Sequence, residues 1–317
     1  MNRIGTVDVD VFPLALGGNT FGWTSDEVES HSVLDAFVAG GGNFVDTADM
    51  YSAWAPGNSG GESETIIGAW IAKRGRHDDI VIGTKVSNHP EFMGLSAANV
   101  AAAADASLAR LGTDVIDVYW AHYDDENTPM EETVAAFDAL LRAGKIRNVA
   151  LSNYSAARVD EWFAIAEAAG FTLPVALQPH YNLVTREPFE SDFAALAEKK
   201  GMAVVPYFSL AAGFLTGKYR TREDLTGKAR ERQVGGYFTD EGLAVVSALD
   251  EVSAAHGVEL ATTALAWLRA QPNVVAPIAS ARTLEQLPAL LASASVVLTP
   301  DELGKLDAVS SRVPVAS

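Results

Sequence analysis

Short apolar runs recur along the chain, and each is followed by a polar or glycine-rich turn. The runs lie at residues 14–18, 43–48, 79–85, 115–122, 148–153, 174–179, 203–208 and 274–279. Segments with apolar residues at helical spacing lie between them, at 26–41, 62–75, 96–112, 129–145, 155–170 and 188–201, and most of these end in glycine, as helices usually do. This alternation predicts an α/β fold with a parallel sheet of eight strands.

Eight such units in 317 residues predict a closed (β/α)8 TIM barrel, in a single domain over residues 1–317. An open doubly wound sheet would more often split into two domains, and no G-x-G-x-x-G motif follows the first strand. Alternation over residues 4–12 predicts an N-terminal β-hairpin that plugs the barrel bottom. Two extra helices are expected at 239–257 and 258–271, and residues 216–238 lack helical periodicity and are expected to form a long functional loop.

Composition excludes several classes of function. A net charge of −18 would repel nucleic acids and anionic lipid surfaces, so neither is an expected partner. The chain has no cysteine, which rules out disulfides, thiolate metal sites and thiol nucleophiles and suits the reducing cytoplasm. No window is apolar for long enough to cross a membrane, and the N-terminus lacks the long apolar core of a secretion signal. We therefore expect a cytoplasmic protein.

Polar residues end most of the apolar runs, where a barrel builds its active site. They are Asp46, Tyr51, Lys85, His122, Ser152, Asn153, Gln178 and Tyr207. Each has an ordinary alternative role when taken singly, such as a helix cap, a solvated lysine or a core histidine. No metal site is expected, because His122 and His180 do not have metal-ligand spacing.

Four of these residues come from three consecutive strand ends and can meet in one barrel mouth: Asp46, Tyr51, Lys85 and His122. A tyrosine with an ordinary pKa of about 10 is a poor acid at neutral pH, and a nearby lysine ammonium lowers that pKa. Asp46 is the expected counter-ion that keeps a buried Lys85 charged. His122 could orient a carbonyl oxygen. Together they predict a proton donor at the barrel mouth.

Six motifs, in order along nearly the whole chain, resemble the aldo-keto reductases, and bacterial members related to potassium-channel β subunits in particular. They are "GGNFVDTADMYS…GESETIIGAWI", "VIGTK", "VYWAHYDDENTPMEETVAAFDALLRAGKIRNVALSNYS", "LQPHYNL", "PYFSLAAGFLTGKY" and "IASARTLEQL". The resemblance implies a (β/α)8 barrel that binds NADPH and passes hydride to an aldehyde or ketone. It implies Tyr51 as general acid, Lys85 and Asp46 as the pair that tunes it, and His122 as the residue that orients the carbonyl.

The resemblance also implies cofactor contacts. Ser152, Asn153 and Gln178 match positions that bind the nicotinamide carboxamide, Tyr207 matches the aromatic residue that stacks on its ring, and Asp46 is expected near it. The matched pyrophosphate loop comprises Phe208, Ser209, Leu210, Ala212, Gly213 and Lys218, and Gly18 with Asn19 matches the glycine-rich end of the first strand. Arg230 matches a further cofactor contact.

A local excess of positive charge supports a polyanionic ligand. Residues 218–232 hold six basic residues against three acidic ones, in a chain of −18. By resemblance, Arg282 falls where the family contacts the 2′-phosphate, which favours NADPH over NADH. Gln286 also matches a cofactor contact. The family commonly continues with an acid-amide pair near the adenine, whereas this chain has Gln286-Leu287-Pro288-Ala289-Leu290, and loss of that pair should weaken adenine contacts.

Trp23, Trp54 and Tyr123 follow strand ends and could wall a pocket for a small-molecule carbonyl, or pack under neighbouring loops. Aliphatic aldehydes, aryl ketones, quinones and keto-sugars all stay open as substrates. We interpret Asp49 and Asp124 as loop or cap residues. Two other functions are kept open: an NADP(H)-binding redox sensor or regulatory subunit with slow turnover, and a barrel enzyme that forms a Schiff base on Lys85.

Overall fold

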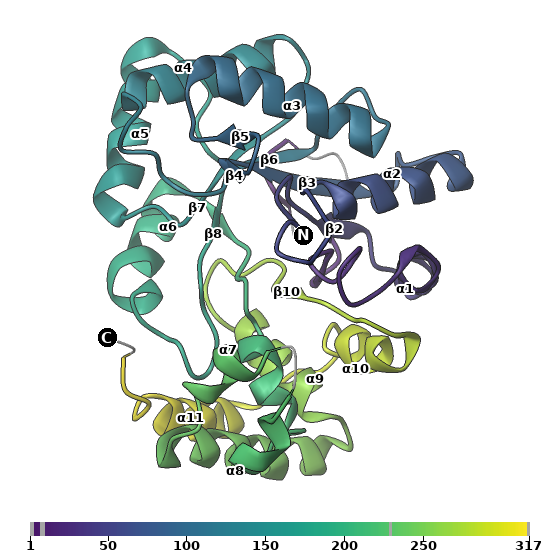
Figure 1. Cartoon of the computed structure of the whole chain (residues 1–317). Coiled ribbons are helices and arrows are strands. Elements are labelled where there is room, and N and C mark those ends of the chain that lie inside the picture. The colour runs from purple at the N-terminus through teal and green to yellow at the C-terminus, as the bar shows by residue number, and fades with distance from the viewer. Residues whose placement is uncertain (1–2, 7–9, 228–229, 316–317) are drawn as a thin grey trace.

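Eight parallel strands form one sheet that curls into a barrel, and helices surround it (Figure 1). The computed structural model describes residues 3–6, 10–227 and 230–315. The strands are β1 (Ala15–Gly17), β2 (Phe44–Asp46), β3 (Val81–Val86), β6 (Val118–Ala121), β7 (Val149–Ser152), β8 (Ala176–Gln178), β9 (Ala203–Val204) and β10 (Ile278–Ala279). They pair in the order β10-β1-β2-β3-β6-β7-β8-β9. Backbone hydrogen bonds from Val275 N to Val204 O (3.0 Å) and from Ile278 N to Pro206 O (2.8 Å) close the barrel, as predicted.

The helices lie where the apolar periodicity predicts them. They are α1 (Glu27–Ala39), α2 (Glu62–Arg74), α3 (Ala97–Leu111), α4 (Met130–Arg142), α5 (Ala156–Ala169), α6 (Ala194–Lys200), α8 (Asp240–His256) and α9 (Leu260–Arg269). Gly75, Gly112, Gly170, Gly201 and Gly257 follow their helices in the left-handed conformation, which glycine adopts without steric cost. The predicted glycine stops are therefore confirmed.

Side-chain alternation along the strands separates two cores. In β6, Val118 and Trp120 point into the barrel, whereas Tyr119 and Ala121 pack outward against the helices. Ile4 and Val11 belong to the interior cluster and are buried, so the N-terminal segment packs into the barrel as the predicted plug requires. The centre of the predicted hairpin, residues 7–9, lies outside the described residues.

Several short elements have no counterpart in the prediction. They are the hairpin β4 (Asn88–His89) with β5 (Phe92–Met93), a π-helical turn η1 (Phe189–Phe193), the 3-10 turns η2 (Ala211–Thr216), η3 (Arg222–Leu225) and η4 (Leu284–Gln286), and helices α7 (Glu231–Gly235), α10 (Leu287–Ala292) and α11 (Pro300–Ser310). The expectation that residues 216–238 hold no helix is wrong for η3 and α7. These turns are stabilised by burial of Leu225 and Val234 rather than by a repeating helical face.

Candidate active site

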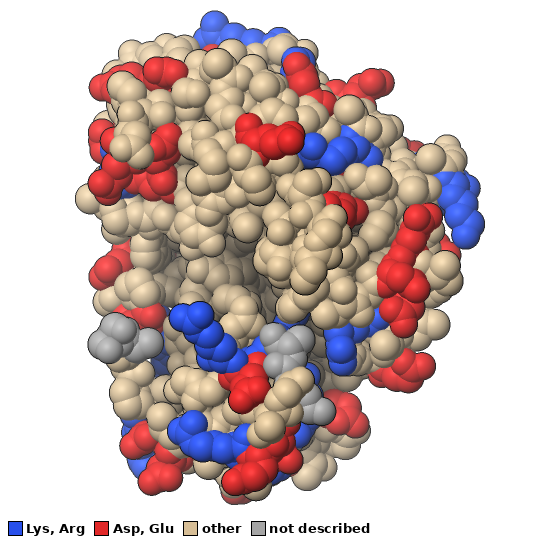
Figure 2. Space-filling view, in the orientation of Figure 1, with Lys and Arg blue, Asp and Glu red and all other residues tan. Residues whose placement is uncertain are grey.

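A cavity of about 1030 Å³ lies at the carboxyl ends of the strands. It reaches the upper end of the range for small-molecule and cofactor sites, roughly 300–1,000 Å³. Figure 2 shows a hollow in the middle of this face, lined mostly by uncharged side chains, with lysine and arginine side chains gathered below it. The position agrees with the rule that barrel enzymes build their sites at this end.

Lys85 is the centre of the polar cluster beneath this cavity. Its fully buried ammonium donates hydrogen bonds to Asp46 Oδ2 (2.5 Å), to the Thr47 carbonyl oxygen (2.6 Å) and to the Tyr51 hydroxyl (3.1 Å). Asp46 is the last residue of β2 and pairs in register with Gly83 of β3. Lys85 lies two residues further along β3, on the same face as Gly83, so its ammonium reaches Asp46. Gln178, the last residue of β8, donates from Nε2 to Asp46 Oδ1 at 3.0 Å.

The pKa values follow from this burial. Burial alone would lower the pKa of Lys85, but the charge of Asp46 and the Tyr51 hydroxyl outweigh it, and the pKa lies above its ordinary value. Lys85 is therefore an ammonium. Burial raises the pKa of Tyr51, and the opposing effect of Lys85 is smaller. The expectation that Lys85 brings the pKa of Tyr51 below its ordinary value is thus wrong for the protein alone, because the loss of solvent outweighs the charge.

His122 follows β6 at the opposite side of Tyr51, with the two ring centroids 6.3 Å apart. Its side chain is buried, and Nδ1 has no hydrogen-bond partner among the described residues. Burial, followed by the charge of Lys85, holds the pKa of His122 well below its ordinary range. The imidazole is therefore neutral at physiological pH and can donate one hydrogen bond.

Amide and hydroxyl groups connect this cluster to the strands that follow. Tyr207 donates from its hydroxyl to Asn153 Oδ1 at 2.8 Å. Asn153 Nδ2 in turn donates to the His122 carbonyl oxygen (2.8 Å) and to Ser152 Oγ (3.1 Å). Ser152 donates to the Gln178 carbonyl oxygen at 3.0 Å. The predicted strand-end residues therefore form one continuous hydrogen-bonded wall.

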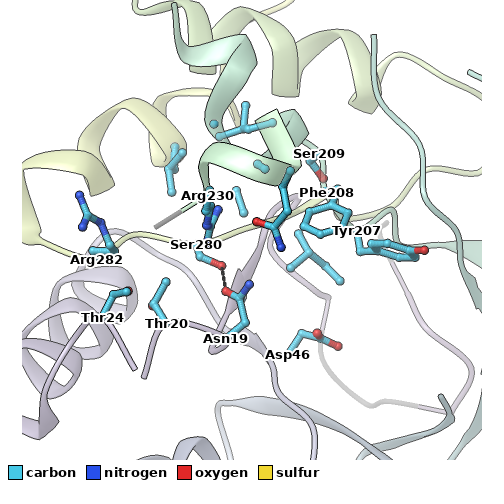
Figure 3. A pocket seen from close by; sticks show the side chains of 18 of the residues that line it. Asn19, Thr20, Thr24, Asp46, Tyr207, Phe208, Ser209, Arg230, Ser280 and Arg282 are labelled. Atoms are coloured by element: carbon cyan, nitrogen blue, oxygen red, sulfur yellow. Dashed lines mark hydrogen bonds between the residues drawn. The ribbon is translucent and has the colours of Figure 1, made fainter. Parts of the chain in front are cut away.

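Two arginines mark the other end of the cavity, away from Asp46 and Tyr207 (Figure 3). Burial and the charge of Arg282 lower the pKa of Arg230, so the two guanidinium groups lie within electrostatic reach. Neither has an ion-pair partner in the described part of the chain. Below them, Ser280 donates a hydrogen bond to Asn19 Oδ1 at 2.6 Å. Two neighbouring cations of this kind in an acidic protein fit a phosphate-bearing ligand.

Aromatic rings line the cavity near the tyrosine. The ring of Trp23 meets that of Trp54 edge-on with centroids 5.6 Å apart, and Trp54 meets Tyr51 at 6.0 Å. Tyr123 lies 4.7 Å from His122, measured between ring centroids. Trp54 and Tyr123 are exposed at the rim. The guanidinium of Arg230 lies 6.0 Å from the centroid of the Trp23 ring, so the aromatic lining reaches one of the two arginines.

The aldo/keto reductase family model matches residues 13–311. The chain belongs to the aldo/keto reductase family. It is 31% identical to Protein tas of Escherichia coli (strain K12), over 97% of this chain and 96% of that protein. It is 32% identical to a probable voltage-gated potassium channel subunit beta of Arabidopsis thaliana, over 98% and 97%. A norsolorinic acid reductase, stcV of Emericella nidulans, is 30% identical over 94% of this chain and 78% of that protein.

This membership confirms the resemblance and the barrel, and it identifies an oxidoreductase fold whose family typically uses nicotinamide cofactors. No helix in the described part of the chain is long and apolar enough to cross a membrane. Within the same residues, no group of three or more His, Asp or Glu side chains could hold a metal ion.

Most of the predicted site residues of this reductase-family chain line the cavity. The exceptions are Lys85, which lies beneath it, and Gly18, whose neighbour Gly17 lines it instead. Residues that the prediction missed include Thr20, Thr24, Met50, Tyr219, Gln233, Glu259 and Ser280. Ser280 directly follows β10, so the strand-end rule could have found it, whereas Tyr219 and Gln233 reach the cavity from the irregular segment 216–238 and carried no such signal.

Proposed function

We propose that this protein reduces an aldehyde or ketone to the alcohol with NADPH as hydride donor, and that Tyr51 is the general acid. The observation that carries the proposal is the buried Lys85 ammonium, which contacts both Asp46 and the Tyr51 hydroxyl at the floor of a cavity whose far end holds two guanidiniums. We further propose that the chain acts as one catalytic domain, and that it works in the cytoplasm, which its lack of cysteine suits.

The residues along the cavity fit this cofactor. Arg230 and Arg282 offer charge to phosphates, and a guanidinium can bind a phosphate through two parallel hydrogen bonds. Arg282 would select NADPH through its 2′-phosphate, and the Gln286 side chain that accepts from Arg282 N (2.9 Å) holds this turn in place. Gly213 has a positive φ of 101°, a backbone conformation that residues with a Cβ rarely adopt, so glycine is favoured at this position of the turn.

At the other end, Ser152, Asn153 and Gln178 would bind the carboxamide, and the ring of Tyr207 would support the nicotinamide. Asn19 and Asp46 line the cavity floor between the two ends, while the turn from Phe208 to Gly213, with Ser209, Leu210 and Ala212, follows Tyr207 along the wall. When bound, NADPH supplies a hydride to the carbonyl carbon. Proton transfer and orientation of the carbonyl group depend on side chains of the protein.

The Tyr51 hydroxyl would give its proton to the carbonyl oxygen as the carbon gains hydride. The Lys85 ammonium, 3.1 Å from that hydroxyl, would stabilise the phenolate that remains, because it already donates to the same oxygen. Neutral His122 would donate to the carbonyl oxygen and hold it against Tyr51 without competing as an acid. Trp23, Trp54 and Tyr123 would pack around the carbonyl compound and exclude water.

The test is a titration of the purified protein with NADPH and with NADH, followed by quenching of tryptophan fluorescence. The absorbance of NADPH is then recorded after addition of an activated aromatic aldehyde. We expect tighter binding of NADPH and aldehyde-dependent oxidation. Binding of neither nucleotide would overturn the proposal, and borohydride trapping of a carbonyl on Lys85 would then identify Schiff-base chemistry. Tight binding without turnover of any carbonyl would favour the regulatory function.

A further inference from the structure

A second buried polar cluster lies on the outer side of the barrel wall, directly behind Lys85. It consists of Asp49, Glu64, Thr84, Arg110 and Tyr119. Thr84 precedes Lys85 in β3, and successive side chains of a strand point to opposite faces, so Lys85 faces the cavity and Thr84 faces helices α2 and α3. Asp49, Glu64, Thr84 and Tyr119 are all fully buried. None of these residues has a role in the proposed reaction.

The cluster holds two carboxyl groups and one cation. Glu64 accepts from the Thr84 hydroxyl at 2.5 Å and from Arg110 Nε at 2.7 Å, which satisfies its charge. Neither carboxyl oxygen of Asp49 has a side-chain or backbone partner of normal geometry among the described residues. The nearest other cation, Lys85, is already paired with Asp46 across the strand. An ionised Asp49 would therefore be a buried charge without a counter-ion, which is strongly unfavourable.

The electrostatics agree with an uncharged Asp49. Burial, followed by the charge of Glu64, raises the pKa of Asp49 well above its ordinary value of 3.8. Arg110, the Met50 backbone N–H and Lys85 act in the opposite direction and are outweighed. Burial raises the pKa of the neighbouring Tyr119, in β6, well above its ordinary value, so this phenol is neutral as well. The surroundings of Asp49 therefore favour its uncharged form.

Asp49 also belongs to the turn that carries Tyr51. Its backbone N–H donates to the carbonyl oxygen of Lys85 at 3.2 Å, and Tyr51 N donates to Ala48 O at 3.1 Å to form the turn. Thr47 N donates to Gly83 O at 2.8 Å. The turn is therefore fixed to β3 on its backbone side, and the Asp49 side chain fills the space between this turn and the Glu64–Arg110 pair.

We propose that Asp49 is a positioning residue for Tyr51 and that it works as an uncharged carboxylic acid. Its completely buried side chain supports the turn by occupying the space behind it, and as an uncharged acid it adds no second negative charge behind the Lys85–Tyr51 pair. That neutrality matters because negative charge disfavours the phenolate: the charge of Asp46 already raises the pKa of Tyr51. The link to catalysis rests on the proposed role of Tyr51, whereas the uncharged state of Asp49 can be tested without any substrate.

The first test uses the protein alone. Infrared difference spectra of wild type against Asp49→Asn should show, near neutral pH, the carbonyl stretch of a protonated carboxyl group that the variant lacks. Asp125→Asn is the control, because Asp125 accepts from Leu95 N (2.8 Å) and from the Thr128 hydroxyl (2.7 Å). Burial would raise the pKa of Asp125, but these hydrogen bonds outweigh it and hold the pKa below its ordinary value, so this carboxyl group is ionised. If the wild type has no such band, Asp49 is ionised and the proposal is overturned.

Urea unfolding at different pH values provides an independent test of whether Asp49 is charged. An acid whose folded pKa is raised loses stability as pH rises above its unfolded pKa, because only the unfolded state releases the proton. Asp49→Asn cannot ionise, so its urea midpoint should rise relative to wild type as the pH is raised from about 4 to about 7. Asp125→Asn should show the opposite sign, with a midpoint that falls relative to wild type over the same pH range, because the folded pKa of Asp125 is lowered. A midpoint for Asp49→Asn that falls with pH relative to wild type would contradict the proposal.

Turnover tests the positioning role. Asp49→Ala should lower kcat about tenfold or more with the substrate KM little changed, because misplacement of a reacting group by about 1 Å costs this much or more. Asp49→Asn should restore kcat to the wild-type value. The fall of its kcat at alkaline pH should occur over the same pH range as in wild type. An alkaline limb that moves to lower pH in Asp49→Asn would show that wild-type Asp49 is charged. Equal kcat in the Ala variant and wild type would refute positioning, even for a fully active reductase.

Discussion

Replacement of Lys85 by methionine should destabilise the fold strongly and in a pH-dependent way. The change removes the ammonium but keeps a side chain of similar length in the barrel. It leaves Asp46 buried with Gln178 Nε2 as its remaining donor, and the Thr47 carbonyl loses its hydrogen bond from Lys85. Breaking a buried ion pair by removing one partner costs about 3–5 kcal/mol, because the other charge is left without compensation. We expect a loss in this range near neutral pH.

The pH dependence follows from Asp46. In the wild type, burial already holds the pKa of Asp46 above its ordinary value, against the opposing charge of Lys85. Without Lys85 this pKa rises further, so the variant folds with Asp46 protonated. A group of this kind contributes stability that is present below the unfolded pKa and lost as pH rises. The deficit of Lys85→Met relative to wild type should therefore be smaller near pH 4 than near pH 7. The difference should grow by about 1.4 kcal/mol for every tenfold by which the loss of Lys85 further weakens the acidity of Asp46 in the folded state.

The assay is urea unfolding, followed by tryptophan fluorescence, of wild type, Lys85→Met, Asp46→Asn and the double variant. If the two side chains act as a pair, the double variant should be more stable than Lys85→Met, because the neutral amide needs no counter-ion. The coupling free energy should reach about 2 kcal/mol, within the range for contacting residues. Destabilisations that simply add, or a deficit that grows at acid pH, would refute this account of the buried pair.

Three further predictions concern the reaction. Tyr51→Phe should lower kcat by about 10²–10⁴-fold, the range for loss of a general acid, with NADPH affinity measured by fluorescence unchanged. Arg282→Ala should weaken NADPH binding by about 10–100-fold, the equivalent of a hydrogen bond to a charged group, and should change NADH binding by no more than about twofold. Equal losses of affinity for both nucleotides would contradict the 2′-phosphate contact. The pKa of His122 is lowered well below its ordinary value, so the pH profile of kcat/KM should not fall on the acid side near pH 6.5 or so. A fall there that disappears in His122→Gln would contradict a neutral histidine.

Much of the barrel could be predicted, and so could the meeting of four polar residues at its mouth, because both depend on local periodicity. Asp46 ends β2, Lys85 precedes the last residue of β3 and His122 directly follows β6. In a parallel barrel these ends meet at one mouth, whatever the helices outside look like. The segment 216–238 could not be predicted in the same way. Its buried residues, Leu225 and Val234, belong to the large core cluster outside the barrel, so their spacing follows tertiary packing rather than a helical repeat.

Charge balance is the other property that periodicity does not reveal. The pKa of Tyr51 depends on how far solvent is excluded, and burial outweighs the neighbouring ammonium that the sequence correctly placed beside it. Asp49, interpreted from the sequence as a loop or cap residue, does lie in a turn, yet its side chain is completely buried. Burial is the main cause of its raised pKa, and the charges that act on it next belong to Glu64 and Arg110. These two residues are 46 residues apart on two helices, and each has the sequence pattern of an ordinary surface residue. Whether a carboxyl group near Tyr51 is an anion or a neutral acid is therefore set by the packing of α2 and α3 behind the barrel wall.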